Sequence, residues 1–234
     1  MDCFICHRSN WMQEKCLAFL KNLLEYYKDK IEDSDVFLPL EHHGADELLA
    51  RLVREALPQE VIEKMSENNR WGRNLDLDDD DVHVTLQVLW NNVESHSKVK
   101  DILSALFESA MKCPWSEEGE QDVFHGKMME LQRTLKLSDR EIDLMLVSLA
   151  LHENILCDPR NRGGRISTST NVFMMTKCLN VSEAAVLDSG ANQKPLRRFD
   201  CLDDDLDFNG RLYPFLCGLT DEPLANSYFT KDTG

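Results

Sequence analysis

The chain has 234 residues, of which 42% are hydrophobic and 29% charged, and its formal net charge at pH 7 is −16. This composition is typical of a globular protein with a sizeable core and excludes a largely disordered chain. The densest apolar stretch, LMLVSLAL at 144–151, is under half of the roughly 18 residues that a membrane helix needs. The first residues of the sequence do not have the pattern of a signal peptide, so we expect a cytoplasmic protein.

Four candidate metal ligands lie near the amino terminus, and they are Cys3, Cys6, His7 and Cys16. The stretch CFICH has the spacing that attaches a c-type haem, but neither an export signal nor a distinct axial partner accompanies it. Zinc is the stronger metal alternative, although the ligands do not form the two paired motifs of a typical zinc site. We interpret these residues as reduced thiols beside a helix start and expect no cofactor, with a small metal-binding redox protein as an alternative.

The first two-thirds of the chain have the periodicity of amphipathic helices. Apolar residues from Trp11 to Ile31 recur at steps of three and four, and Asn10 with Gln13 is expected to form a capping box before them. The same reasoning predicts further helices over 45–57, 58–65, 82–93, 97–112 and 120–135. We assign residues 1–135 to one helical domain.

The pattern changes from residue 137 onward. Ser138 and Glu141 form a second expected capping box, and the helix that they begin is apolar on several faces, which indicates burial at the centre of a domain. A basic loop then precedes a predicted helix over 171–179. Asn180 and Val181 are expected to form a tight turn before a second short helix.

A hairpin and a last short helix are predicted to complete this region. The hairpin would turn at Asn209-Gly210, and the helix would follow over 212–219. The order helix, turn, helix, hairpin is that of a winged helix-turn-helix. We therefore predict a mainly α fold in which a helical bundle is followed by a winged-helix-like unit with a small β-hairpin over 136–218, and then by a tail or linker over 219–234.

The charge is distributed unevenly, because residues 158–200 contain seven basic and four acidic side chains and are locally +3. The candidate nucleic-acid-binding residues in this segment are Arg160, Arg162, Arg165, Lys194, Arg197 and Arg198. Arginine beside glycine and serine is suited to gripping phosphates. The alternative is that these cations pair with the chain's own carboxylates, and the strongly negative total charge favours this alternative.

No motif of catalytic spacing occurs in the sequence. The patterns H-E-x-x-H, G-x-S-x-G and G-x-G-x-x-G are all absent. The acidic runs beginning at Asp76 and Asp205 lack the closing glutamate of a calcium-binding loop. We therefore expect a chain without an active site of its own.

Two stretches, LSDREIDLMLVSLALHEN and PLRRFDCLDDDLDFNGRLYPFLCGL, resemble the region just ahead of the ATPase module in a group of bacterial AAA-family ATPases. In that group, a leucine-rich helix, a short helix pair and a phrase of the type s-pLrr-gLl followed by l-l-p-l---L-G form a winged-helix-like unit. The residues that carry the phrase here are Pro195, Leu196, Arg197, Arg198, Phe199, Leu212, Pro214, Leu216 and Gly218. Phe199-Asp200 departs from the pattern, which favours small residues there.

The resemblance covers residues 137–218 and implies that the chain is the leading part of a longer ATPase. In such ATPases the leading domain typically recruits substrates or partners and influences ring assembly. The resemblance thus implies a non-catalytic protein-interaction domain with a protein partner. The alternative is a winged-helix transcription regulator that binds DNA through residues 158–200.

Overall fold

A computed structural model describes residues 9–27, 31, 34–37, 40, 51, 55, 60, 63, 82–92, 95–110, 122–156, 167–219 and 224. The α-helices are α1 (Asn10–Tyr26), α5 (Val82–Asn91), α6 (His96–Ala110), α7 (Val123–Leu135), α8 (Asp139–His152), α9 (Thr168–Cys178), α10 (Glu183–Ser189), α11 (Pro195–Arg198) and α12 (Tyr213–Leu216). Two 3₁₀ helices are η2 (Ser34–Phe37) and η3 (Gly210–Leu212). The predicted mainly α fold is confirmed, and no strand forms within these residues.

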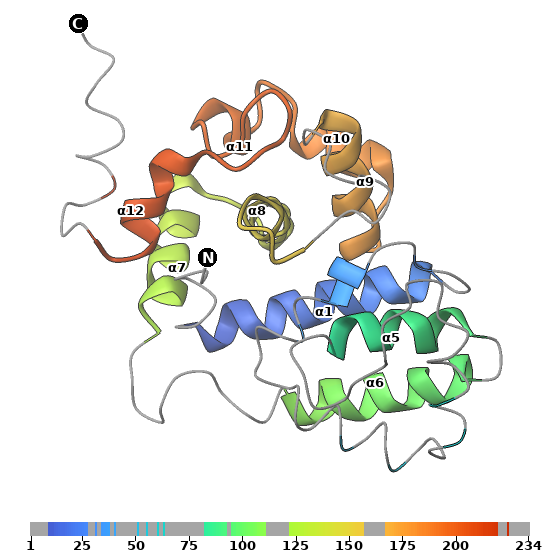
Figure 1. Ribbon diagram of the computed structural model, residues 1–234. Coiled ribbons are helices and arrows are strands. Elements are labelled where there is room, and N and C mark those ends of the chain that lie inside the picture. The colour runs from blue at the N-terminus through green and yellow to red at the C-terminus, as the bar shows by residue number, and fades with distance from the viewer. Residues whose placement is uncertain are drawn as a thin grey trace, which may run out of the picture.

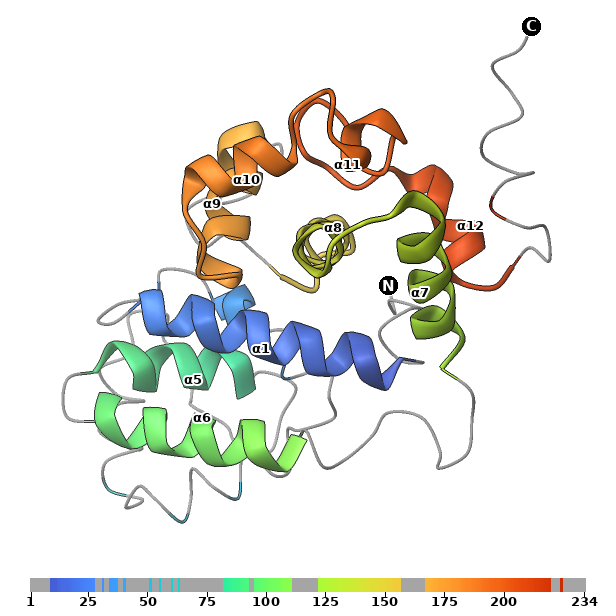
Figure 2. The same ribbon diagram turned by 180° about the vertical axis from the view of Figure 1, so that it is seen from behind.

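Helix α8 lies inside a ring that the other helices of its region form. Its axis points toward the viewer in Figures 1 and 2, with α1, α7, α9, α10, α11 and α12 around it. Every residue from Leu144 to Leu151 is buried. Because this stretch has no polar face to turn toward water, it requires cover on all sides. Its packing against α1 and α9 supplies part of that cover.

Helix α1 forms the side of this ring that faces a second layer, made of α5 and α6 (Figure 1). It packs against α7, α8 and α9, while α5 packs against α6 and η2. The Asn91 side chain fixes the chain beyond α1, since its Oδ1 accepts from the Ile31 N–H at 2.7 Å and its Nδ2 donates to the Ile31 carbonyl at 2.6 Å. The predicted division into domains at residue 135 stays a prediction.

One carboxylate stabilises the first turns of both α1 and α7. The Asp122 side chain accepts from the His125 N–H at 2.9 Å, which caps α7. It also accepts from the Ser9 hydroxyl at 2.9 Å and from the Trp11 N–H at 3.2 Å. Negative charge is favourable at these amino-terminal ends, where N–H groups lack helical partners.

Two predicted helix starts need correction. Helix α1 is capped by Ser9, whose Oγ accepts from the Met12 N–H at 3.1 Å, so the predicted Asn10–Gln13 capping box is wrong. Helix α9 begins at Thr168, three residues before the predicted 171, because Ser167 caps it. The second predicted capping box is confirmed, with Ser138 and Glu141 in reciprocal contact at the start of α8.

The predicted tight turn between α9 and α10 is confirmed. Asn180 adopts the left-handed conformation with φ 51°, and Ser182 caps α10. The predicted hairpin does not form, because the only pairing described there is one antiparallel bridge between Leu202 and Phe208. Asn209 caps η3 through a bond to the Arg211 N–H, so it starts a helix rather than a hairpin turn.

The predicted helices over 45–57 and 58–65 fall mainly outside the described residues. Helices α5, α6, α7 and α12 confirm predicted helices, with shifted ends. No helix in the described part of the chain is both long and apolar enough to cross a membrane.

We predict that Asp122→Ala lowers the free energy of unfolding by about 1–3 kcal/mol, because it removes a cap from α7 and a bond from the start of α1. Asp101→Ala is the matched control, since Asp101 is exposed on α6 and its loss changes the net charge equally. Urea unfolding of both variants measures the difference. Equal stabilities for the two variants would show that the shared cap contributes nothing.

Candidate functional site

A run of four aspartates interrupted by Leu206 forms the acidic loop, defined here as Asp203–Asp207. The Asp203 carboxylate accepts from the N–H groups of Asp205 and Asp207, both at 2.9 Å. The Asp203 N–H in turn donates to the Asp207 carbonyl at 2.9 Å. These bonds satisfy part of the loop's own backbone. Two neighbouring carboxylates are also engaged, since Asp205 accepts from the Thr168 hydroxyl and Asp204 pairs with Arg197.

The acidic loop is also held to the core from beneath. The Ser148 hydroxyl on α8 donates to the Leu206 carbonyl at 2.9 Å, and the Asn171 Nδ2 on α9 donates to the Asp205 carbonyl at 2.9 Å. Leu206 has φ 59° and is buried, so its side chain enters the core while its neighbours face water. A methyl group added at Gly190 would collide with Leu206, so glycine leaves the room that this insertion needs.

Two of the predicted nucleic-acid-binding cations are engaged by the chain itself. The Lys194 Nζ lies 3.2 Å from an Asp188 carboxylate oxygen. Arg197 forms an ion pair with Asp204, and its guanidinium also donates to the Leu202 carbonyl at 3.4 Å. The Arg197 side chain is only 12% exposed, which leaves little of it available to a phosphate.

Arg198 differs from its neighbour, because it is exposed and lies over the Phe199 ring, with its guanidinium carbon 5.4 Å from the ring centre. Arg160, Arg162 and Arg165 lie outside the described residues. The structure therefore brings Lys194, Arg197 and Arg198 to one short segment around α11. Their predicted role in binding nucleic acid stays a prediction.

The predicted metal ligands are only partly described. Cys3, Cys6 and His7 lie outside the described residues, whereas Cys16 is buried in α1. Within the described part of the chain, no group of three or more His, Cys, Asp or Glu side chains is arranged to hold a metal ion.

Cys201, which stands just before the acidic loop, is held in its neutral form. Burial raises the pKa of this thiol from 9.0 to about 12, and the nearby Asp200 and Glu141 carboxylates add to the effect. A thiol must ionise to act as a nucleophile or metal ligand. At neutral pH, Cys201 is therefore a small core residue.

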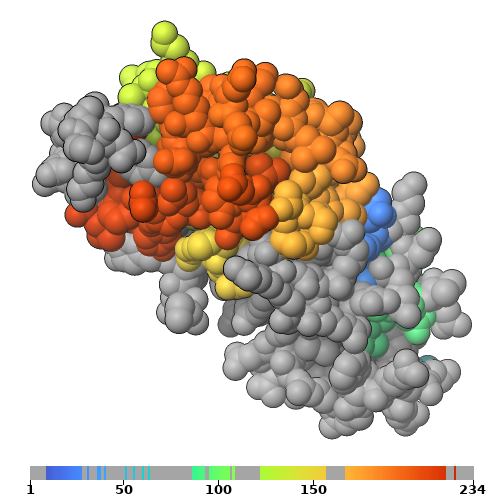
Figure 3. Space-filling view, turned by 90° about the horizontal axis from the view of Figure 1, so that it is seen from above, coloured from blue at the N-terminus to red at the C-terminus, as the bar shows by residue number. Residues whose placement is uncertain are grey.

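Exposed carboxylates lie in two neighbouring segments of the chain. Asp203, Asp204 and Asp205 are exposed in the acidic loop, as are Glu183 and Asp188 on α10. The segments α9–α12 adjoin one another on one face in the space-filling view (Figure 3). Leu187, next to Asp188 on α10, is 47% exposed. An apolar side chain on an acidic segment is suited to contact with a basic surface.

The sequence reasoning missed Ser148 and Asn171, the two side chains that anchor the acidic loop. Both are completely buried. A signal for Ser148 was present, because it is the one polar residue within LMLVSLAL. A polar group in such a helix needs a hydrogen-bond partner in the interior. The identity of that partner, 58 residues away, had no local signal.

Comparison of the chain with models of protein families, with curated proteins and with solved structures finds no match in any of the three.

We predict that Ser148→Ala lowers the free energy of unfolding by about 1–3 kcal/mol, because it leaves the buried Leu206 carbonyl without its donor. Ser97→Ala, at an exposed position of α6, is the control and should stay within about 0.5 kcal/mol of the wild type. Amide hydrogen exchange at Asp205 and Asp207 should also accelerate in Ser148→Ala alone. Unchanged stability and exchange would contradict the anchoring role.

We predict a specific loss of stability above pH 9 that depends on Cys201. Below pH 9 the thiol is protonated in both states, whereas between pH 9 and about 12 only the unfolded chain releases the proton. The unfolded state then binds fewer protons, so the free energy of unfolding falls as pH rises. Denaturant unfolding from pH 8 to 11 should show a steeper fall for the wild type than for Cys201→Ala. Parallel profiles would contradict the raised pKa.

Proposed function

We propose that this chain is a non-catalytic protein-interaction domain of an AAA-type ATPase, in which residues 136–218 form a winged-helix-like unit that recruits a substrate or partner. The observation that carries the proposal is the charge of the face around α10. Its exposed carboxylates are Glu183, Asp188, Asp203, Asp204 and Asp205. Two of these, Asp188 and Asp204, pair with Lys194 and Arg197, so the excess negative charge is that of Glu183, Asp203 and Asp205.

The geometry favours a protein partner over duplex DNA. In a helix-turn-helix the second helix enters the major groove and lies close to the phosphates. Here that helix is α10, which has only 7 residues and exposes two carboxylates, Glu183 and Asp188. Negative charge at this position opposes phosphate contacts, since DNA affinity depends on lysine and arginine.

The partner that this face fits is a basic protein surface with an apolar recess. Leu187 can enter such a recess, because half-exposed leucine on a helix gains free energy when a partner covers it. The surrounding carboxylates would steer basic side chains toward it and reject acidic proteins. The fixed acidic loop adds to this fit, because a surface that is already ordered loses less conformational entropy on binding.

The resemblance of residues 137–218 to the region ahead of an ATPase module supports the link to an AAA machine. Determining the reading frame beyond Gly234 tests that link. The proposal expects an in-frame Walker motif, G-x-x-x-x-G-K-[ST], in the protein encoded there. A stop codon directly after Gly234, with no ATPase encoded nearby, would contradict it.

We predict that a fluorescently labelled DNA duplex shows no binding tighter than about 10⁻⁴ M at physiological salt, because the face that would meet it is acidic. Fluorescence anisotropy over a series of salt concentrations measures this. The control changes Arg160, Arg162, Arg165, Arg197 and Arg198 together to alanine. Salt-dependent binding that this variant abolishes would establish the alternative function, a DNA-binding regulator.

A further inference from the structure

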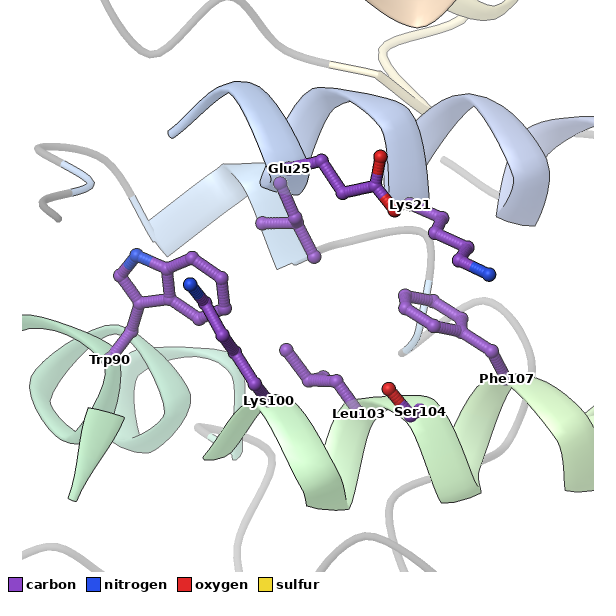
Figure 4. Close-up of a pocket in the computed structure, with 8 residues that line it drawn as sticks. Lys21, Glu25, Trp90, Lys100, Leu103, Ser104 and Phe107 are labelled. Atoms are coloured by element: carbon purple, nitrogen blue, oxygen red, sulfur yellow. The ribbon is translucent and has the colours of Figure 1, made fainter. Parts of the chain in front are cut away.

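A cavity of about 470 Å³ lies between α1 and α6, on the side of the molecule away from the acidic loop (Figures 1 and 4). The residues that line it are Lys21, Leu24 and Glu25 of α1, Trp90 of α5, and Lys100, Leu103, Ser104 and Phe107 of α6. Its volume falls within the range of about 300–1,000 Å³ that is common for small-molecule sites.

Two aromatic side chains mark the ends of the cavity. Trp90 stands near the carboxyl end of α5, next to the short turn into α6, and Phe107 lies at the other end on α6 (Figure 4). Helix α5 packs against α6, so the position of Trp90 is fixed relative to the α6 side of the cavity.

The floor and the rim of the cavity differ in chemistry. Leu24, Trp90, Leu103 and Phe107 are buried apolar side chains that form the floor. The rim carries ammonium groups at both ends, with Lys100 beside Trp90 and Lys21 beside Phe107 (Figure 4). The Lys100 Nζ lies 5.6 Å from the centre of the Trp90 ring, which is within the range of a cation–π contact.

The two rim lysines are the important electrostatic feature. Neither forms an ion pair with a carboxylate in the described part of the chain. Glu25 is the one acidic residue among those lining the cavity, so the lining has an excess of one positive charge in a chain of net charge −16. An anion is therefore favoured at this rim, although the rest of the protein repels it.

We propose that this cavity binds a small amphipathic monocarboxylate, with the apolar body on the floor and the carboxylate at Lys21 or Lys100. The apolar body of the ligand leaves water when it covers the floor, which is the main favourable contribution. The carboxylate then replaces water at an ammonium group that has no ion-pair partner among the described residues. This inference is independent of the proposed function, because it concerns a different face of the molecule.

Decanoate is the probe for a direct test by isothermal titration calorimetry at concentrations below its micelle threshold. The site predicts one-to-one binding of decanoate, and much weaker binding of decyltrimethylammonium, which has the same chain with the opposite charge. Butyrate should also bind much more weakly, because it lacks the apolar body. In a ¹⁵N spectrum, decanoate should shift the indole N–H signal of Trp90, which Trp90→Phe identifies among the four tryptophans.

Four variants test the position of the ligand. Lys21→Gln combined with Lys100→Gln should weaken decanoate binding about two- to fivefold, the effect of one exposed charge pair at whichever lysine holds the carboxylate. Lys98→Gln is the charge control on the same helix, since Lys98 is exposed and does not line the cavity. Ser104→Phe should fill the opening and abolish binding, whereas Ser97→Phe should not.

Several results would overturn the proposal. These are an absence of decanoate binding, equal affinity for decyltrimethylammonium, and equal affinity in the double lysine variant. Binding that survives in Ser104→Phe would place the ligand elsewhere. Because both lysines are exposed, the double variant keeps the test decisive even if Ser104→Phe fails to fold.

Discussion

The burial of α8 on every side is the constraint on which the rest of the structure depends. A helix whose residues 144–151 are all buried has no face for water, so other elements must surround it. Helices from both ends of the chain supply this cover, with α1 on one side and α9–α12 on the others (Figure 1). The short helices α11 and α12 are too brief to be stable alone and owe their order to this packing.

The buried helix α8 also helps to position the acidic loop on the surface. Ser148 is the one polar side chain in the buried stretch of α8, and its bond to the Leu206 carbonyl fixes the acidic loop from within. Asn171 adds a second bond from α9. The carboxylates outside are therefore positioned by groups in the core. The buried Ser148 and Asn171 side chains thus determine where the acidic loop lies on the surface.

Local sequence patterns predicted the structure correctly where the stabilising contacts join residues that are close together in the chain. The Ser138–Glu141 capping box and the turn at Asn180 each involve residues a few positions apart, and both were predicted correctly. The burial of α8 could also be predicted from the sequence, since a helix that is apolar on all faces must be covered by other parts of the protein. Patterning of this kind predicts the elements of the fold and their environment.

Sequence patterns did not predict features that depend on contacts between residues far apart in the chain. Asn209-Gly210 has the composition of a hairpin turn, but Asn209 instead caps η3. The cap of α1 is local, because Ser9 accepts from the Met12 N–H, and the prediction misplaced it by one residue. The Asp122 carboxylate that adds to this cap is 113 residues from Ser9, and no spacing rule connects the two. The cavity between α1 and α6 also had no signal in the sequence, because side chains from three separate helices line it.

The candidate site shows the same division between local and distant signals. The sequence indicated an excess of basic residues over 158–200, and it also favoured their pairing with the chain's own acids. Lys194 and Arg197 do pair in this way. Their partners, Asp188 and Asp204, could not be identified from the sequence alone, because the pairing depends on how α10, α11 and the acidic loop meet in space.

Native-state amide hydrogen exchange tests the central claim most directly. If α8 is the element on which the others depend, its amides from Leu144 to Leu151 should exchange only through global unfolding, with the largest protection free energies in the protein. The account predicts that these values equal the free energy of unfolding measured with denaturant. Exchange of α8 by local opening, while α1 and α9 stay protected, would contradict it.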